Sequence, residues 1–395
     1  MEFRFLNTWE PVVPLYRRLF PALAARDHTV EAWLARTPYR SGELAYPNEP
    51  GIRYQELPTG ARAMPAGLRK RLVHAGWGTS VALHSLFGKG TDLNVFLTQP
   101  PLFQSWGRVL AALRGQPYAL IVMDLYPWVA IEAGVLPRTG WATRRLINLA
   151  RGALLGARRV FAIGRCMEAR LLEIGVAPER IVLVHNWVDH EVIQPLPRDE
   201  NPLRERLGLG DRFVLMYSGN LGVSHVFDEL IEVLKRFRDR DDVAFVVAGQ
   251  GSRRQQLEQA AEANGLHNLH LLDYQPADQL GASLSLGDAH FVCVREGFDG
   301  LVVPSKAYGV FAAGRPMIYL GDPAGEISRL VTEHDLGISI VPGDADALAD
   351  AIETLRADPA RGVAQGQRAR VLIEGELNRS EMIRRYFEAL EVAAR

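Results

Sequence analysis

Short apolar runs alternate with amphipathic stretches along the whole chain, and this alternation predicts the elements of the fold. Runs of five or six mostly apolar residues, such as 213–217 and 289–294, have the length of buried strands. Between such runs, apolar residues recur at helical spacing, for example Phe227, Leu230 and Leu234. Strands that alternate with helices are typical of parallel sheets covered by helices. The pattern therefore predicts an α/β fold with doubly wound parallel sheets.

The same pattern starts twice, which predicts two Rossmann-like domains. The first domain covers residues 1–189, and a polar segment with prolines at 190–210 is the expected linker. The second domain covers 211–378, and a final helix at 379–395 is long enough to cross back onto the first. Within the first domain, residues 37–61 are rich in Gly, Pro and Tyr and are predicted to form a long loop.

The composition of the chain predicts where in the cell the protein is located. The chain has 395 residues, of which 48% are apolar and 23% charged, and no apolar run reaches the length of a membrane span. Arg4 and Glu10 interrupt the N-terminal segment, so it does not have the pattern of a secretory leader, and we expect a cytoplasmic protein. The sequence contains two cysteines, Cys166 and Cys293, which gives no basis for a disulfide or a cysteine-based metal site.

Charge is divided unevenly between the two halves. Residues 1–190 hold 23 Lys and Arg against 14 Asp and Glu, a net charge of +9, and residues 191–395 hold 22 against 32, a net charge of −10. A basic half suits an anionic partner such as a phospholipid surface, a lipid diphosphate or nucleic acid. The alternative is that opposite charges help the two domains face each other.

Basic clusters in the first half predict peripheral association with the anionic inner face of the cell membrane. Arg69–Arg71 flank an amphipathic stretch, and pairs of arginines stand at 144–145 and 158–159. The alternative is a set of helices that pack on the sheet and expose a solvated basic face. Nucleic acid is disfavoured as a partner, because the arginines are scattered and lack interleaved aromatic residues on a recognisable module.

The strongest functional pattern is the segment 292–320, in which an apolar strand is followed by a glycine-containing loop and a helix. The loop carries Glu296 and Asp299, and the helix begins near Ser305 and Lys306. A helix N-terminus presents free backbone N–H groups and the positive end of its dipole, to which Lys306 adds a full charge. Carboxylates suit sugar hydroxyls, so the segment predicts a nucleotide-sugar site. The alternative is an ordinary strand-loop-helix with a solvated lysine and a capping serine.

Turns after other strands of the second half add polar candidates. Gly219 and Asn220 form a second glycine turn after the strand 213–217, although no Gly-Lys-Ser/Thr signature follows it. Tyr274 and Gln275 follow another predicted strand, at a place where a nucleotide base could stack or pair. Both turns are candidates for contacts with the same ligand.

Polar residues also follow strands of the first half. The predicted strand 118–123 delivers Asp124 to a strand end, where open α/β sheets bind their ligands, and Tyr126 comes two residues later. The loop after the first strand, which contains Glu10, should border a cleft for the same reason. This loop lacks the glycines of a dinucleotide fingerprint, which argues against a Rossmann oxidoreductase. The alternative role for Asp124 is an ordinary helix cap.

Several segments together carry a family resemblance: DLYPWVAIEAGVL, HNWVD at 185–189, YSGNLG, VVAGQG and, above all, GLVVPSKAYGVFAAGRP. In these segments the chain resembles the GT-B glycosyltransferases of family four, most closely the bacterial polysaccharide branch related to colanic acid and fucosamine transferases. The resemblance implies two Rossmann-like domains that face a central cleft, with the nucleotide on the C-terminal domain and the acceptor on the N-terminal one. It also implies retention of anomeric configuration, with no metal ion and no cofactor besides the nucleotide sugar.

The resemblance further implies roles for individual residues. Gly219 and Asn220 are expected near the diphosphate, with Ser305 and Lys306 on its oxygens. Charge builds on the departing diphosphate as the glycosidic bond breaks, and Lys306 can stabilise it more in the transition state than before it. The expected site residues are Asp124 and Lys306 (catalytic), Gly219, Asn220, Gln275, Asp299, Gly300, Leu301, Val302, Ser305 and Glu326 (donor-binding), and Glu10 and Tyr126 (acceptor side).

The chain departs from the broader family at positions that carry function there. Five residues before the glycine of AAGRP the family has a second glutamate, where this chain has Gly309, so the ribose needs another partner, for which Glu326 is the candidate. A histidine often precedes the aspartate at the strand end of the first half. Here that residue is Met123, which favours Asp124 as the catalytic residue.

A third departure concerns the glycine turn. The broader family has basic residues after it, and this chain has Ser224 and His225. More of the charge of the phosphates is then left to Lys306.

These observations lead to one main hypothesis and two alternatives. The main hypothesis is a retaining transferase that moves a sugar from a UDP- or GDP-sugar to a lipid-linked saccharide acceptor, such as a polyprenyl-diphosphate-linked sugar. The first alternative is a nucleotide-sugar epimerase of the same architecture, which would need no acceptor. The second is a non-catalytic, two-lobed sugar-binding protein, which would require an export signal.

Overall fold

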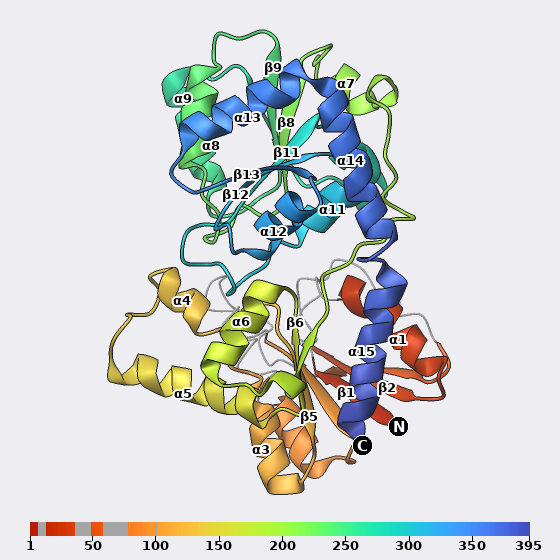
Figure 1. Cartoon of the computed structure of the whole chain (residues 1–395). Coiled ribbons are helices and arrows are strands. Elements are labelled where there is room, and N and C mark those ends of the chain that lie inside the picture. Colours follow the sequence, from red (N-terminus) through yellow and green to blue (C-terminus); the bar gives the residue numbers. More distant parts are fainter. Residues whose placement is uncertain (7–12, 36–48, 58–77, 79, 99–100) are drawn as a thin grey trace. The chain divides into compact units, whose positions relative to one another are not determined.

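The computed structural model describes all residues except 7–12, 36–48, 58–77, 79 and 99–100, and the chain forms two compact units (Figure 1). Unit 1 consists of Met1–His185 and Met382–Arg395, and unit 2 of Asn186–Glu381. Each unit is built around one parallel sheet with helices packed against it. The predicted α/β class with two parallel-sheet domains is confirmed.

The sheet of unit 1 has the order β3-β2-β1-β4-β5-β6-β7, and its neighbouring strands run parallel. The strands are β1 (Glu2–Leu6), β2 (Thr29–Ala35), β3 (Ile52–Leu57), β4 (Leu93–Leu97), β5 (Tyr118–Ile121), β6 (Arg159–Ala162) and β7 (Ile181–Leu183). Every residue of β4 and β5 is buried. Such continuously buried strands suit the middle of a sheet that is covered on both faces.

The prediction of one long loop over 37–61 is wrong near its C-terminal end, where β3 forms an edge of the sheet. This strand pairs with β2 along its whole length, from Ile52 opposite Val30 to Leu57 opposite Ala35. An edge strand needs few buried side chains, so polar residues and flanking glycines concealed its pattern. The rest of the predicted loop lies largely outside the described residues.

Helices of unit 1 include α15 (Arg379–Ala394), α1 (Val13–Ala24), α3 (Ser105–Arg114), α4 (Trp128–Glu132), α5 (Trp141–Gly156) and α6 (Arg165–Ile174). The C-terminal helix α15 packs on this unit through specific contacts. Tyr386 stacks on Phe161 of β6 with ring centroids 4.6 Å apart, and Glu391 forms an ion pair with Arg26. The last part of the chain therefore belongs to the same unit as the first.

Unit 2 repeats the arrangement with the strand order β10-β9-β8-β11-β12-β13, again parallel throughout. The strands are β8 (Phe213–Ser218), β9 (Val243–Ala248), β10 (Leu269–Leu272), β11 (Ala289–Cys293), β12 (Met317–Leu320) and β13 (Gly337–Ile340). Around them lie α7 (Pro202–Arg206), α8 (Asp228–Arg236), α9 (Arg254–Asn264), α10 (Leu280–Leu284), α11 (Lys306–Ala312), α12 (Glu326–Glu333), α13 (Ala345–Ala357) and α14 (Pro359–Glu374). The helical apolar stripe of Phe227, Leu230 and Leu234 is buried in one core with sheet residues.

Residues 190–210, predicted as a linker, lie within unit 2. Arg204 is buried and donates hydrogen bonds to the carbonyl oxygens of Gly210 and Arg212. Arg370 of α14 donates to the carbonyl oxygen of Ile193 at 2.7 Å. Because charged donors satisfy its backbone carbonyls, this segment is held against the unit rather than left extended in solvent.

Candidate active site

The glycine turn after β8 and the start of α11 after β11 meet at one point of the unit 2 sheet. The order of the strands reverses there, because β9 and β10 follow β8 on one side and β11 lies on the other. Open α/β sheets bind ligands outside the carboxyl ends of the strands at such a reversal. The two segments are in direct contact, since the Lys306 ammonium donates to the carbonyl oxygen of Asn220 at 3.2 Å.

Two glycine turns, after β8 and β9, pack backbone against backbone beside this point. The Gly219 N–H donates to the Ala248 carbonyl, and the Leu221 N–H donates to the Gln250 carbonyl, both at 2.9 Å. Gly249 has a φ of 145°, and a Cβ there would lie 2.0 Å from the carbonyl oxygen of Gly219. Only glycine allows both this backbone conformation and this approach. The two turns therefore form one structural unit.

Lys306 lies at the centre of the site. Its Nζ contacts the Tyr217 hydroxyl, lies 4.1 Å from the centroid of the Tyr217 ring, and lies 3.0 Å from His225 Nε2. The stem of Lys306 runs along Gly219, where a Cβ would lie 3.2 Å from Lys306 Cε. Within the described part of the chain, the polar partners of this ammonium are a phenol, an imidazole and a carbonyl, and no carboxylate pairs with it.

Burial sets the protonation of this cluster. It lowers the pKa of Lys306 to about 7, against a smaller opposite effect of Cys293. Burial, followed by the charge of Lys306, lowers the pKa of His225 to about 3. Burial also raises the pKa of Tyr217, so the phenol is neutral. An ammonium in such surroundings has lost water without gaining a counter-charge, so an anionic ligand would stabilise it strongly.

Ser305 is exposed directly before Lys306, and its side chain makes no capping hydrogen bond to α11. The expected alternative was a capping serine beside a solvated lysine. Neither residue has that role in this structure. The hydroxyl of Ser305 and the ammonium of Lys306 lie next to each other in the chain, and both are polar groups available to a ligand.

The loop between β11 and α11 is a compact turn. Asp299 and Val302 form an isolated bridge, and Gly300 between them has a φ of 73°. Leu301 is 6% exposed, so the loop is anchored by an apolar side chain. The four predicted donor-binding residues of this loop, from Asp299 to Val302, thus lie in one tight structure, which fixes their backbone amides relative to each other.

The Asp299 carboxylate lies against the start of α12. A Cβ on Gly325 would be 2.6 Å from Asp299 Oδ1, and Glu326 follows as the first residue of the helix, 2% exposed. Gly309 is buried in α11, where a Cβ would meet Leu284 Cδ1 at 3.3 Å. The structure thus brings Asp299 beside Gly325, the residue before Glu326, and the ribose role of Glu326 stays a prediction.

Tyr274 and Gln275 follow β10. The Tyr274 side chain is 56% exposed, and its hydroxyl donates to the Gln250 carbonyl at 3.3 Å, next to the second glycine turn. The Gln275 amide donates to the Asp273 carbonyl at 3.0 Å. An exposed aromatic ring in this position suits stacking against a planar ligand.

Asp124 and Tyr126 lie in unit 1, after β5. The hydroxyl oxygen of Thr98 accepts the backbone N–H groups of Met123 at 3.2 Å and Asp124 at 3.4 Å. Burial, and then the charge of Asp124, raises the pKa of Tyr126, so the carboxylate and the phenol are neighbours. Two other predicted features, Glu10 and Arg69–Arg71, lie outside the described residues.

Sequence reasoning missed the residues that support Lys306. Tyr217 was counted as part of an apolar strand, and His225 was noted as the absence of a basic residue. The sequence did contain a signal for both residues. Tyr217 stands just before the glycine turn and His225 three residues after Gly222, so both side chains flank the turn. Among the described residues, no group of three or more His, Cys, Asp or Glu could hold a metal ion.

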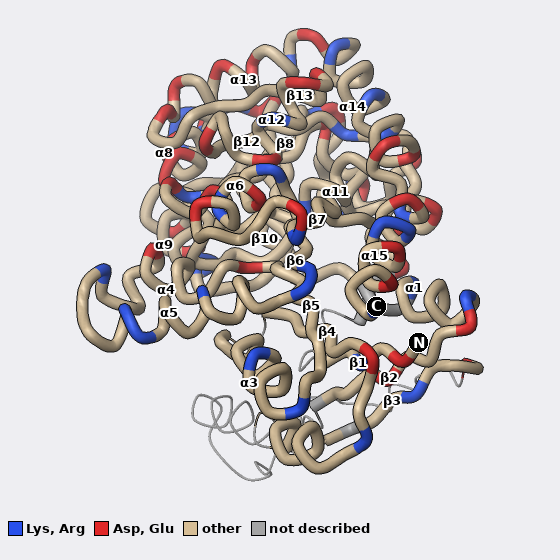
Figure 2. Tube along the Cα trace, turned by 60° about the horizontal axis from the view of Figure 1, so that its bottom comes forward, with Lys and Arg blue, Asp and Glu red and all other residues tan. Residues whose placement is uncertain are grey.

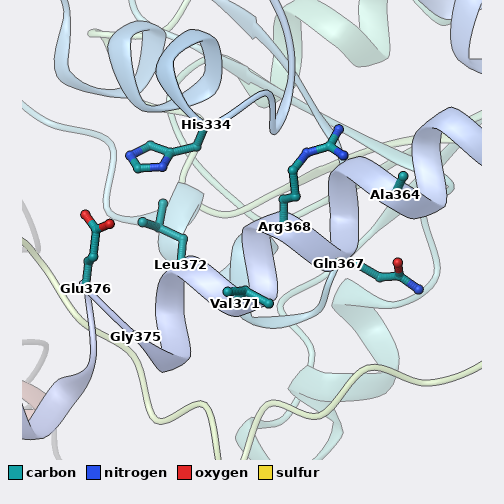
Figure 3. Close-up of a pocket in the computed structure, with 8 residues that line it drawn as sticks. All are labelled: His334, Ala364, Gln367, Arg368, Val371, Leu372, Gly375 and Glu376. Carbon is teal, nitrogen blue, oxygen red and sulfur yellow. The ribbon is translucent and has the colours of Figure 1, made fainter.

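A separate hollow of about 550 Å³ lies between α14 and the C-terminal end of α12 (Figure 3). His334, Leu372 and Glu376 line it. Because α12 follows β12 and runs back along the sheet, its C-terminal end lies near the amino ends of the strands. This hollow is therefore distinct from the site around Lys306.

Two units of this kind, each built on one parallel sheet with helices packed against it, are the architecture of the GT-B glycosyltransferases. A family model described as "Glycosyl transferases group 1" matches residues 199–372, and one described as "Glycosyl transferase 4-like domain" matches residues 14–187. The chain belongs to the family-four type of these GT-B enzymes. The resemblance seen in the sequence is thereby confirmed.

Curated relatives agree with this family. A Pseudomonas aeruginosa protein named as the glycosyltransferase WbjE is 29% identical over 70% of this chain and 68% of its own length. An Escherichia coli protein named as the colanic acid biosynthesis glycosyl transferase WcaI is 28% identical over 80% of this chain and 79% of its own length.

Solved structures share the fold at lower identity. HepE of Anabaena in complex with UDP and glucose has a TM-score of 0.75 and 16% identity, covering 99% of this chain and all of that one. A sucrose-phosphate synthase from Thermosynechococcus elongatus has a TM-score of 0.78 and 16% identity, covering 99% of this chain and 98% of that one.

Proposed function

We propose that this glycosyltransferase moves a sugar, with retention of configuration, from a UDP- or GDP-sugar to a saccharide acceptor in surface polysaccharide biosynthesis. The observation that carries the proposal is the partly buried amino group of Lys306, with which no described carboxylate pairs, at the strand reversal of unit 2. A nucleoside diphosphate supplies the missing negative charge. The relative named for colanic acid biosynthesis and the neighbour solved with UDP and glucose support the substrate class.

In this proposal, chain residues stabilise the leaving group without a metal ion or other cofactor. The diphosphate becomes more negative as the glycosidic bond breaks, and Lys306 lies in low-dielectric surroundings where its charge acts strongly. The hydroxyl of Ser305 and the backbone N–H of Asn220 add hydrogen-bond donors around it, and Gly219, which has no side chain, lets the backbone come close to the ligand. Asp299 to Val302 then contact the sugar, and Glu326 the ribose.

We assign the acceptor to unit 1. Asp124 and Tyr126 follow β5 at a strand end, and the Asp124 carboxylate can accept a hydrogen bond from an acceptor hydroxyl. Glu10, in the loop after β1, is proposed on the same side. A lipid-linked saccharide fits this half because it carries a diphosphate, and the half is basic.

Membrane association forms part of the proposal, and helix α5 gives it a surface. From Val135 to Arg159 the sequence contains six arginines and no acidic residue, and Figure 2 shows basic positions along α5. Trp141 at the start of α5 is 73% exposed, and the Arg145 guanidinium lies over its ring. Tryptophan and arginine together suit a lipid headgroup layer. We propose a peripheral contact on the cytoplasmic side through this surface. None of the described helices has the length and apolar character of a membrane span.

A panel of nucleotide sugars with lipid-linked and free saccharide acceptors tests the activity. We expect nucleotide release with one UDP- or GDP-sugar, dependent on an acceptor, and a fall of tenfold or more in Lys306→Ala, since one lost charge contact in a transition state costs about 10²–10³ in rate. Equal activity of this variant would refute the role of Lys306. Conversion of the nucleotide sugar without any acceptor would instead identify an epimerase.

A further inference from the structure

The contact between Lys306 and His225 joins two nitrogen atoms, and this restricts their protonation. His225 Nε2 and Lys306 Nζ are 3.0 Å apart, a hydrogen-bond distance. An ammonium has only donors, and a protonated ring nitrogen is also a donor. One of the two atoms must therefore supply a lone pair.

The backbone decides which atom that is. The Gly222 N–H points at His225 Nδ1 at 3.2 Å, and a backbone amide can only donate. Nδ1 thus carries the lone pair, and a neutral ring carries its proton on Nε2, which faces Lys306. The lone pair at the Lys306–His225 contact then belongs to the lysine, which accepts from Nε2–H as an uncharged amine.

The remaining contacts of Lys306 are compatible with an uncharged amine. Its own N–H groups donate to the Tyr217 hydroxyl oxygen and to the Asn220 carbonyl, while the Tyr217 hydroxyl donates to that same carbonyl at 2.7 Å. Every polar atom in the cluster then has a partner of the correct kind. With an ammonium, either the contact to His225 or the one from Gly222 would bring two donors together.

The charged and titratable groups around Lys306 do not favour an ammonium in the ligand-free protein. These groups are Tyr217 of β8, His225 after the glycine turn, Cys293 of β11 and, one step further, Tyr274 after β10 and Glu229 of α8. Burial raises the pKa of the Cys293 thiol to about 12, so it is neutral, and it donates to the Val226 carbonyl at 3.0 Å. The carboxylate of Glu229 accepts the Gly343 N–H at 2.7 Å and forms no ion pair with Lys306.

We propose that Lys306 rests as a neutral amine held by His225 and Tyr217, and that binding of a nucleoside diphosphate is coupled to the uptake of one proton by this amine. On binding, Lys306 Nζ takes a proton from solvent and no longer accepts the hydrogen bond from His225 Nε2–H. The resulting ammonium donates a hydrogen bond to a phosphate oxygen. His225 and Tyr217 are positioning residues, since they act through Lys306. The inference rests on the proposed function, because it requires a diphosphate in this site. The lowered pKa values of Lys306 and His225 agree with it.

Titration calorimetry of UDP and of GDP tests the coupling between pH 7.5 and 8.5, in buffers that differ in heat of ionisation. This range lies above the second pKa of a phosphate, about 6, so the phosphates of the ligand do not titrate. We expect uptake that approaches one proton and an affinity that falls up to tenfold for each unit of pH, as linkage requires. Binding with no proton uptake and no dependence on pH overturns this inference alone. Absence of binding by both nucleotides overturns the proposed function as well.

Paired variants separate the positioning role from general damage. His225→Asn keeps an acceptor near Nδ1 for Gly222 but removes Nε2, so we expect the pH dependence to move to higher pH and uptake at pH 8 to fall. His225→Gln, which retains a polar group near Nε2, restores part of it. Lys306→Met abolishes uptake, and the matched control Lys235→Met, on the exposed face of α8, leaves uptake unchanged. Equal uptake in wild type and His225→Asn would exclude His225 from the coupling.

Discussion

Lys306 illustrates how a single residue can be kept at a cost to stability. Burial penalises its charge, and the described structure supplies dipoles rather than a carboxylate in return. Residues that bind charged ligands often carry such a penalty, because the ligand later supplies the counter-charge. The stability of the ligand-free protein should therefore report on this residue.

Lys306→Met should make the ligand-free protein more stable. The pKa of Lys306 is about 7 when folded against an ordinary value of 10.5, so between these values the unfolded chain binds more protons, and stability rises with pH. Below pH 7 both states are protonated and the burial cost is complete. The gain from Lys306→Met is thus largest near pH 6, about 1–3 kcal/mol once partial exposure is allowed for, and shrinks toward pH 10.

Urea unfolding at pH 6, 8 and 9.5 measures this gain, through the midpoint of the transition of unit 2. Lys235→Met, which removes an exposed lysine, is the control and should shift the midpoint little at each pH. A gain that is equal at all three values would mean that burial of charge is not its cause.

At the scale of an element, the glycine turns after β8 and β9 pack against each other and position the backbone beside Lys306. Their contact depends on the absence of side chains, since a Cβ at Gly249 would lie 2.0 Å from a backbone oxygen and one at Gly251 would lie 2.3 Å from another. Backbone atoms cannot move aside as a flexible side chain can. The position of Gly219, and with it the space for the Lys306 stem, follows from this packing.

Gly249→Ala should separate the two turns and weaken both folding and diphosphate binding. Gly343→Ala is a matched control, because Gly343 also has a positive φ, 91°, but no atom lies within 4 Å of its added Cβ. The backbone conformation alone costs about 1–2 kcal/mol, so Gly343→Ala should lose that amount, and Gly249→Ala clearly more. Urea midpoints measure the loss of stability, and calorimetry measures the affinity for whichever of UDP and GDP the wild type binds. Equal losses in the two variants would contradict a collision between the turns.

At the scale of the whole molecule, the uneven charge of the chain has a local counterpart on α5. Arg144 and Arg145 are exposed beside Trp141, and Arg145 covers the indole ring. Charges on such a surface attract anionic lipid, and the attraction is screened by salt. Membrane contact would bring the enzyme to a lipid-linked acceptor.

Sedimentation with vesicles tests this surface. We expect binding to vesicles with anionic lipid and weaker binding to neutral ones or in high salt. Arg144→Gln/Arg145→Gln should lower the partition coefficient roughly 30-fold, at about 1 kcal/mol for each arginine. A double variant of exposed unit 2 arginines, Arg238→Gln/Arg361→Gln, serves as the control. Equal binding to anionic and neutral vesicles would contradict the proposed role of α5 in membrane association.

Much of the fold was readable from the sequence, because buried parallel strands and amphipathic helices have distinct periods. The strand β8 and the helix α8 were both recognised in this way. The edge strand β3 was not, since it buries few side chains, and its pattern looks like that of a loop. The hydrophobic pattern does not predict a strand whose side chains are mostly exposed, because burial then does not restrict which residues occur there.

The sequence by itself determined the α/β class, the two parallel-sheet domains and the glycosyltransferase family, because these follow from periodicity and from motifs that are continuous in the chain. It also singled out Lys306. Only the tertiary structure decided what surrounds that lysine. Tyr217 and Cys293 come from different strands, and His225 follows a turn. The contacts of Tyr217 and His225 with Nζ, and the burial of the lysine, arise from the packing of β8 against β11. Protonation depends on those neighbours in space, which the order of residues does not specify.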